Sequence, residues 1–382
     1  MTGKSDKPLR VLFLIDSLAT GGAERITVAL LPHFDRTQII PIVCPLTRRW
    51  EGFLGDLVPP DQRDGIKSKR LLDPFAFRRL LRLIREQEID IIHAQLQYAT
   101  FFGAAATRFT GVPMVVTRHL IGDFSYNLRS RLRNRLEHMT IRRYAARVIT
   151  VSNAAQENYA KLAGISPERM ITIYNGIDVE KFTVTGDKRS MREALNLPVD
   201  KTLVTLVGVM REGKGHTVAI DAMRQLEDTD VRLLFAGDGW KRDDFEQYAR
   251  DLGDRVIFLG ERKDVPDILA ASDIVILPSD TEALPTVLIE AGGAGLPTIA
   301  TDGGGCPEVV LDDETGIIIP LQNPDALARA IRRLLNHPET AQKMGKAAYE
   351  RVHALFTLPV QAAALSTVYQ EIVREDTRQK SI

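Results

Sequence analysis

Short runs of consecutive apolar residues alternate along the chain with longer segments whose apolar residues recur at helical spacing. The runs of the first half are RVLFLI, IIPIVC, IDIIHA, PMVVT, RVITVS and MITIY, and those of the second half are TLVTLVG, VRLLFAG, RVIFLG, DIVILPS, PTIAT and GIIIP. Strands that are apolar at consecutive positions are buried on both faces, as in parallel sheets covered by helices. The two arrays predict two doubly wound α/β domains in succession.

A polar, turn-rich stretch between the arrays predicts the domain boundary. We expect a Rossmann-like domain over residues 1–174, a linker over 175–200 and a second Rossmann-like domain over 201–358. The last periodic stretch predicts a helix over about 359–376 that packs back onto the first domain. Ligands of such sheets bind at the carboxyl ends of the strands, so we expect a site in a deep cleft between facing domains.

Composition limits the class of protein. The chain has 382 residues, 44% of them apolar, which is enough for a large core. Cys44 and Cys306 lie far apart without a C-x-x-C pair, so a reducing cytoplasm fits better than a disulfide framework or a cysteine zinc site. The first apolar run is too short for a signal sequence or a membrane span. We expect a cytoplasmic protein that is at most peripheral to a membrane.

The net charge of zero conceals an asymmetry between the two halves. Residues 1–174 hold 26 Lys and Arg against 16 Asp and Glu, a charge of +10, and the remainder holds 24 against 34, a charge of −10. Such a difference concerns binding partners and not the fold, so the N-terminal half should prefer an anionic partner.

One segment concentrates this positive charge. Residues 128–143 predict a helix with Leu128, Leu132, Leu136 and Met139 in one stripe. The stripe is flanked by Arg129, Arg131, Arg133, Arg135, Arg142 and Arg143. Such a helix can rest on an anionic membrane. Alternatively, the stripe packs on its own domain and the arginines are merely solvated.

Two features of the first half follow strands. Gly21 and Gly22 precede a helix, where backbone amides can approach an anion, although Glu24 could equally close an ordinary capping box. No G-x-G-x-x-G fingerprint is present, which argues against a nicotinamide enzyme. His119 and His93 follow strands and could bind a sugar hydroxyl or titrate, but a lone histidine is more often structural.

In the second half, Arg211 and Lys214 lie in a loop between a strand and a helix, where paired cations suit a diphosphate. Solvated loop cations are the plainer interpretation, and the loop is not a Walker A motif. The segment SDTEALPTVLIEAGG follows another strand and places Glu282 in a loop and Glu290 within a helix. Between them, the backbone near Leu284, Pro285, Thr286 and Val287 forms a helix start that can bind a phosphate.

With these residues in place, the chain resembles the retaining glycosyltransferases of family 4, which have the GT-B fold. The resemblance runs nearly from end to end through TGGAER, IIHA, VVTRH, ITVSNAAQ, YNGID, GKGH, FAGDGWKRDDFE, VIFLGERKDVPDILAASDIVILPS, the glutamate pair, GLPTIATDGGGCPEVV and TGIIIP. It implies a nucleotide-diphosphate sugar donor that binds mainly to the C-terminal domain.

The resemblance also implies a role for each candidate residue. Glu282 would bind hydroxyls of the transferred sugar and Glu290 the ribose, while Arg211 and Lys214 would hold the diphosphate. His119 would bond the sugar near its reacting carbon. Gly21 and Gly22 would approach the phosphates, and Glu261 and Arg262 would lie near the base.

Two positions depart from the pattern of the family. Val209 stands where many members have arginine, so Arg211 would supply that charge from two positions further along. Ala283 stands where glycine is common, so the loop is either displaced or free of a left-handed conformation. Metal dependence is not expected, because the D-x-D at Asp228 and Asp230 precedes a strand and so lies at the wrong end of the sheet.

Together with these features, the resemblance implies a retaining, metal-independent glycosyltransferase that moves a hexose-type sugar to a glycan or lipid-linked acceptor in cell-envelope or exopolysaccharide synthesis. The resemblance favours same-face attack assisted by the departing phosphate, so no dedicated nucleophile needs to exist, and none stands out in the sequence. No nucleic-acid partner and no cofactor are expected. A nucleotide-sugar epimerase of the same fold and a non-catalytic nucleotide-sugar-binding protein remain as alternatives.

Overall fold

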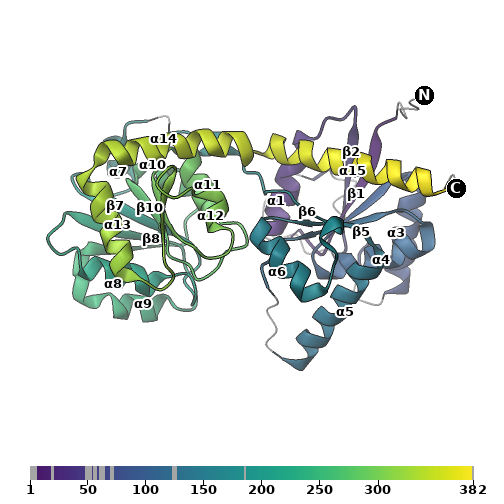
Figure 1. Ribbon diagram of the computed structural model, residues 1–382, viewed down its shortest axis with the longest axis horizontal. Helices are drawn as coiled ribbons and strands as arrows, with labels where there is room; N and C mark the ends of the chain where they lie inside the picture. Colours follow the sequence, from purple (N-terminus) through teal and green to yellow (C-terminus); the bar gives the residue numbers. More distant parts are fainter. Residues whose placement is uncertain are drawn as a thin grey trace. The chain divides into compact units, whose positions relative to one another are not determined.

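The computed structural model describes residues 7–18, 21–47, 54, 58–59, 65–68, 73–122, 127–184 and 186–380. The chain divides into two compact units (Figure 1). Unit 1 comprises residues 1–176 and 358–382, and unit 2 comprises residues 177–357. Each unit contains a doubly wound parallel sheet, which confirms the fold class predicted from the apolar runs.

The described part of unit 1 is built on a six-stranded parallel sheet of order β2-β1-β3-β4-β5-β6. The strands are β1 (Leu9–Ile15), β2 (Ile39–Pro45), β3 (Ile91–Gln95), β4 (Met114–Arg118), β5 (Ala145–Thr150) and β6 (Met170–Thr172). The strand order reverses between β1 and β3, and ligands of open α/β sheets bind where such a reversal occurs. The carboxyl ends of β1, β3 and β4 are therefore the first place to look for chemistry.

Helices cover both faces of this sheet. They are α1 (Gly22–Leu30), α3 (Pro74–Glu86), α4 (Gln97–Thr110), α5 (Leu128–Tyr144), α6 (Asn153–Ala163) and α15 (Leu358–Lys380), with short 3-10 turns η1 (Leu31–His33) and η3 (Pro167–Arg169). One core lies between the sheet and α3, α4, α5 and α6. The other lies between the sheet and α1 with α15, so the last helix of the chain completes unit 1.

Unit 2 has a six-stranded parallel sheet of order β12-β11-β10-β7-β8-β9. The strands are β7 (Thr202–Val207), β8 (Val231–Ala236), β9 (Val256–Gly260), β10 (Ile274–Leu277), β11 (Thr298–Thr301) and β12 (Gly316–Ile319). The order reverses between β7 and β10, which places a second candidate position for ligands at the carboxyl ends of these two strands.

The helices of unit 2 are α7 (Lys188–Ala194), α8 (His216–Arg224), α9 (Arg242–Tyr248), α10 (Val265–Ala271), α11 (Thr286–Gly293), α12 (Cys306–Val309), α13 (Pro324–Asn336) and α14 (Pro338–Leu355), with 3-10 turns η4 (Val179–Phe182) and η5 (Arg250–Arg255). The segment expected as a linker contains α7, which packs within this unit. There the buried Arg192 donates to the carbonyl of Ala271 and to the carboxylate of Asp273. Among the described helices of both units, none is long and apolar enough to cross a membrane.

Candidate active site

Two charged side chains meet at the carboxyl end of the unit 2 sheet. Lys214 follows β7, Glu282 follows β10, and these strands are hydrogen-bonded neighbours. Lys214 Nζ lies 2.6 Å from Glu282 Oε1, and the two side chains are only 18% and 15% exposed. A charge-assisted bond between largely desolvated groups holds both in fixed positions. The structure thus brings together two residues that are 68 positions apart in the sequence.

The loop that carries Lys214 is locked to the end of β10. Gly215 has φ of +76°, and a Cβ at this position would lie 2.0 Å from the carbonyl oxygen of Pro278. The backbone N–H of Asp280 donates to the carbonyl of Gly213 at 2.9 Å. Only glycine tolerates both the left-handed backbone and this close approach. The glycines beside Lys214 therefore set the position of its ammonium group.

The segment between the two glutamates forms the start of α11, with Pro285 as its N-cap and no side-chain cap. Leu284 and Pro285 are buried, whereas Thr286 and Val287 are half-buried. Glu290 is half-buried within the helix. First-turn amides of an uncapped helix are donors for an anion. Ala283 is not among the described residues with positive φ, so alanine fits this loop without strain.

Three other candidate residues of unit 2, Arg211, Glu261 and Arg262, also follow strands but take no part in the ion pair. Arg211 is half-buried, donates to the carbonyl of Glu212 at 3.0 Å, and has no described bond to Lys214 or Glu282. Glu261 is exposed at the end of β9. Arg262 donates through Nε to Asp264 at 2.7 Å, and this bond raises the pKa of its guanidinium.

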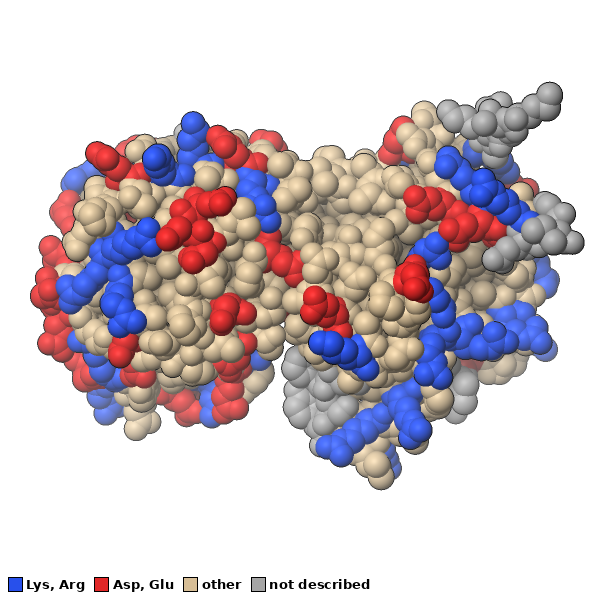
Figure 2. Space-filling model, in the orientation of Figure 1, with Lys and Arg blue, Asp and Glu red and all other residues tan. Residues whose placement is uncertain are grey.

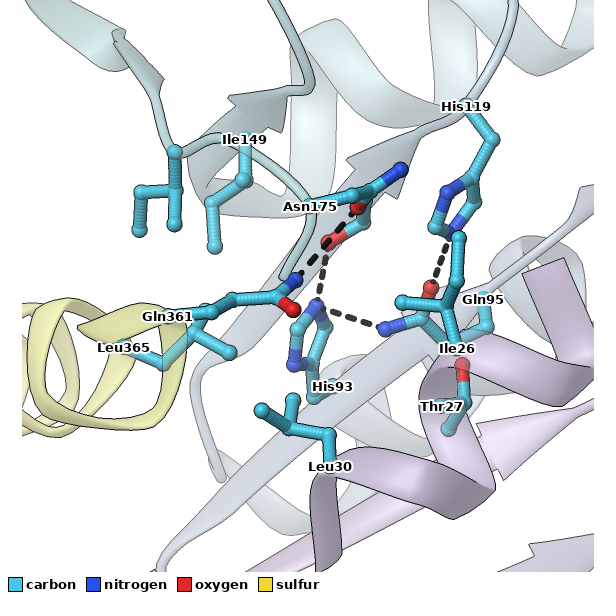
Figure 3. A pocket seen from close by; sticks show the side chains of 12 residues that line it. Ile26, Thr27, Leu30, His93, Gln95, His119, Ile149, Asn175, Gln361 and Leu365 are labelled. Atoms are coloured by element: carbon cyan, nitrogen blue, oxygen red, sulfur yellow. Dashed lines mark hydrogen bonds between the residues drawn. The ribbon is translucent and has the colours of Figure 1, made fainter. Parts of the chain in front are cut away.

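Unit 1 places His119 at the end of a buried hydrogen-bond network, shown in Figure 3. His119 Nε2 lies 2.6 Å from Gln95 Oε1, and Gln95 Nε2 lies 3.1 Å from His93 Nε2. His93 Nε2 also lies 2.6 Å from Thr117 Oγ1, and His93 Nδ1 lies 2.6 Å from Tyr369 Oη. The two histidines singled out in the sequence therefore belong to one network.

The environment keeps both histidines neutral. Burial lowers the pKa of His93 to about 3. Burial, and secondarily the positive charge of Arg118, lowers the pKa of His119 to about 4. His119 Nδ1 is buried and has no hydrogen-bond partner within the described residues. The cavity beside the network, about 10 Å³, holds at most about one water molecule, so a sugar could meet the network only at its edge.

The start of α1 does not form the capping box that Glu24 could have closed. Gly21 is the N-cap, and the helix has no side-chain cap bond. A Cβ on Gly21 would lie 2.1 Å from Glu24 Oε2, whereas nothing lies within 4 Å of one on Gly22. Nearby, Asp16 accepts bonds from the amides of Tyr98 and Ala99 at 3.2 and 2.7 Å. Burial raises the pKa of Asp16 to about 6.

The basic helix α5 turns its apolar stripe outward. Leu128 and Leu132 are 81% and 59% exposed, and Leu136 and Met139 are also exposed. All six arginines named from the sequence are exposed on α5, and Figure 2 shows basic side chains gathered there. The buried residues of this helix include Asn134 and Glu137. The stripe therefore does not pack on its own domain.

Several residues of these sites escaped sequence reasoning. Tyr369 lies in α15, Gln95 directly follows the IIHA motif, and Thr117 lies within VVTRH, but none of the three was singled out. Asp16 directly follows β1, and its bonds to the first-turn amides of α4 depend on the neighbouring strand β3. Alternation of position along β3 and β4 was the one available signal, because it places residues 93, 95 and 117 on a single face of the sheet.

Comparison with known proteins identifies the class. The family model "Glycosyltransferase Family 4" matches residues 20–181, and the model "Glycosyl transferases group 1" matches residues 187–351. The structure of the Anabaena protein HepE in complex with UDP superposes with a TM-score of 0.82 at 25% identity and covers 95% of this chain and 100% of that one. The fold and the two family models therefore define a GT-B glycosyltransferase.

Two relatives in sequence show the family within this class. The chain is 29% identical over 267 residues to the UDP-Gal:alpha-D-GlcNAc-diphosphoundecaprenol alpha-1,3-galactosyltransferase of Escherichia coli, covering 67% of this chain and 68% of that protein. It is 30% identical over 288 residues to alpha-D-kanosaminyltransferase of Streptomyces kanamyceticus, covering 72% and 74%. The chain belongs to glycosyltransferase family 4, so the resemblance seen in the sequence is confirmed.

Proposed function

We propose that this glycosyltransferase moves a hexose-type sugar from a nucleotide-diphosphate donor to a glycan or lipid-linked acceptor with retention of anomeric configuration, in cell-envelope or exopolysaccharide synthesis. The ion pair of Lys214 and Glu282 at the strand-order reversal of unit 2 is the observation that carries the proposal. HepE, its structural relative, has been crystallised with UDP and with UDP-glucose. The Escherichia coli relative is named for a UDP-Gal donor and a diphosphoundecaprenol-linked acceptor.

In this proposal different residues of unit 2 bind different parts of the donor. The Lys214 ammonium and the first-turn amides of α11 bind the diphosphate, and Arg211 adds a further positive charge. Glu282, held by Lys214, accepts hydrogen bonds from hydroxyls of the transferred sugar. Glu290 binds the ribose, and Glu261 and Arg262 lie beside the base.

The proposal also assigns donor-binding roles to residues of unit 1. Gly22 leaves open space at the start of α1, where amides can face the donor phosphates, and Gly21 belongs to the same turn. His119 offers Nδ1, which is buried and unpaired within the described residues, to a sugar hydroxyl near the reacting carbon. Its lowered pKa keeps it neutral above about pH 4, so it serves as a hydrogen-bonding group and not as a titrating acid or base.

The proposed chemistry is a same-face displacement without a protein nucleophile. The acceptor oxygen bonds to the anomeric carbon as the bond from that carbon to the phosphate oxygen breaks. The acceptor proton passes to the departing phosphate, whose charge is stabilised by Lys214. Glu282 is paired with this ammonium and so is poorly suited to attack the sugar. Because side-chain cations and helix amides supply the positive charge, we propose that no metal is required, and activity should survive EDTA.

The outward face of α5 supports a membrane-presented acceptor. Exposed leucines flanked by exposed arginines match an interfacial helix resting on anionic lipid, with each basic residue contributing about 1 kcal/mol. We therefore propose peripheral contact of unit 1 with an anionic membrane surface at the cytoplasmic face. Binding to anionic but not to neutral vesicles is the expected behaviour.

A thermal-shift screen of UDP-, GDP- and ADP-sugars tests the donor assignment. At least one should raise the Tm of the wild type, and Glu282→Ala should remove most of this shift. Glu314→Ala changes an exposed carboxylate of the same unit and should leave the shift intact. If no nucleotide sugar stabilises the wild type, the assignment is wrong. Release of a free epimerised sugar without acceptor, detected by mass spectrometry and NMR, would point instead to an epimerase.

A further inference from the structure

A chain of buried hydrogen bonds joins the last helix of the protein to His119. Tyr369 of α15 contacts His93, His93 contacts Gln95, and Gln95 contacts His119, with donor–acceptor distances between 2.6 and 3.1 Å. Figure 3 shows the part of this chain that runs from His93 through Gln95 to His119. Every member belongs to unit 1. The chain therefore links α15 to Nε2 of His119, the ring nitrogen that is hydrogen-bonded within unit 1.

Two arrangements of protons satisfy this chain, because a glutamine amide can present its oxygen or its nitrogen to either neighbour. In the first, His119 Nε2–H donates to the Gln95 oxygen, and the Gln95 amide donates to His93 Nε2. In the second, the amide is turned by half a rotation. His93 Nε2–H then donates to the Gln95 oxygen, and the Gln95 amide donates to His119 Nε2. Thr117 can donate or accept and so does not decide between them.

Tyr369 does decide. Its side chain is fully buried, its ring lies edge-on to Phe13, and its hydroxyl has a single hydrogen-bond partner within the described residues, His93 Nδ1. A buried phenol with one partner must donate to it, since an unsatisfied buried O–H is costly. His93 Nδ1 is then an acceptor, and His93 carries its proton on Nε2. Only the second arrangement is consistent with this tautomer.

We propose that Tyr369 and Gln95 are positioning residues that fix His119 as the Nδ1–H tautomer, so that His119 donates a hydrogen bond to the sugar of the bound donor. The inference rests on the proposed function for its ligand, but the tautomer itself is a property of the free protein. In the second arrangement His119 Nε2 accepts from Gln95, and the proton must reside on Nδ1, the atom left without a partner. Tyr369 of the last helix thus makes His119 Nδ1 a hydrogen-bond donor and not an acceptor.

Two variants separate the arrangements. Tyr369→Phe removes the hydroxyl that selects the His93 tautomer and should allow both arrangements. Gln95→Glu replaces the amide with a carboxylate that can only accept, so it should force the proton of His119 onto Nε2. Ser366→Ala is the matched control, because Ser366 also lies in α15 but its hydroxyl donates only to Ala362 of the same helix.

Two-bond 1H–15N NMR of the imidazole rings in the donor-free protein reports the tautomers directly. The proposal expects His119 protonated on Nδ1 in the wild type and in Ser366→Ala, on Nε2 in Gln95→Glu, and a mixture in Tyr369→Phe. A wild-type His119 protonated on Nε2, or a tautomer unchanged in both test variants, would overturn it. These outcomes do not depend on enzymatic activity, so they are separate from any failure of the proposed function.

Kinetics then connect the tautomer to the donor sugar. Gln95→Glu should lower kcat by about tenfold, because the sugar hydroxyl must then donate to His119 Nδ1 in place of accepting from it and so loses its other acceptor, with the KM for the acceptor little changed. Tyr369→Phe should give a smaller loss. A normal kcat in a Gln95→Glu protein whose His119 tautomer is reversed would refute the role in sugar binding while leaving the tautomer assignment intact.

Discussion

Arg118 at the end of β4 and Glu137 of α5 form an ion pair at 2.7 Å, with side chains only 11% and 3% exposed. Glu137 also accepts a bond from Gln97 at 2.7 Å. These contacts anchor α5 through its polar side, and a helix anchored in this way points its opposite side to solvent. Because α5 is anchored through its polar side, Leu128 and Leu132 are exposed although the helix packs on unit 1.

Removing charge from α5 should weaken binding to anionic vesicles. The double variant Arg131→Gln and Arg135→Gln lacks two exposed cations, so we expect about 2 kcal/mol weaker binding, about thirtyfold, in co-sedimentation with anionic liposomes at low salt. Leu128→Ser with Leu132→Ser should weaken binding by a similar factor. Leu162→Ser, an exposed leucine of α6, is the control and should bind normally. Equal sedimentation of the wild type with neutral and anionic vesicles would contradict the surface contact.

The Lys214–Glu282 pair should be energetically coupled. Lys214→Met leaves the largely buried Glu282 without its hydrogen bond, and Glu282→Gln leaves the largely buried Lys214 without its counter-charge, so each should lower the free energy of unfolding by about 2 to 3 kcal/mol. The double variant should lose less than the sum by about 1 to 2 kcal/mol. Chemical denaturation measures all three. The exposed pair of Lys201 and Asp230 in the same unit is the control, and its cycle should be close to additive. Additivity in the Lys214–Glu282 cycle would show that this pair contributes no coupling.

Gly215 should tolerate alanine far less well than another glycine with the same backbone. Gly215→Ala combines a left-handed φ with a Cβ 2.0 Å from a carbonyl oxygen, so we expect a loss of at least about 3 kcal/mol of stability. Gly295 has φ of +70° but open space around its Cβ position, and Gly295→Ala should cost only about 1 kcal/mol. Similar unfolding midpoints for the two variants would mean that the loop carrying Lys214 is not locked to β10.

Asp16 should destabilise the protein as pH rises. Burial raises its pKa from 3.8 to about 6, so the folded protein holds a proton that the unfolded chain has already lost. The stability associated with this group is complete below about pH 4 and is lost as pH rises through 6, by up to about 3 kcal/mol. Asp16→Asn keeps an acceptor for the amides of Tyr98 and Ala99 but cannot ionise. It should match the wild type at pH 4 and exceed it at pH 7 in urea denaturation; a pH-independent difference would argue against the raised pKa.

The doubly wound sheets could be read from the sequence because they depend on local patterns. Consecutive apolar residues mark strands covered on both faces, and their alternation with helical segments sets the class of each unit. The same reasoning placed Lys214 and Glu282 after strands. It could not show that β7 and β10 are neighbours, because strand order depends on long-range pairing.

The predictions of the basic helix and of the linker show what local sequence patterns cannot predict. The leucine stripe of α5 was visible, but whether it faced the core or solvent depended on Glu137 finding Arg118 on another strand. The polar stretch over residues 175–200 was read as a linker, yet nearly all of it belongs to unit 2, and Arg192 within it packs against the end of α10. A polar residue joins a core when distant groups satisfy it, and its own neighbours in the sequence do not reveal this.

By itself the sequence determined the class of each sheet and the residue types at the strand ends, because these depend on spacing along a single chain, and its motifs carried the resemblance to the family. Only the tertiary structure decided that Lys214 meets Glu282 and that Tyr369, from the last helix, reaches His93 beside His119. Such contacts join residues far apart in sequence, and both their geometry and the burial that shifts the pKa values of the two histidines arise only when the chain packs.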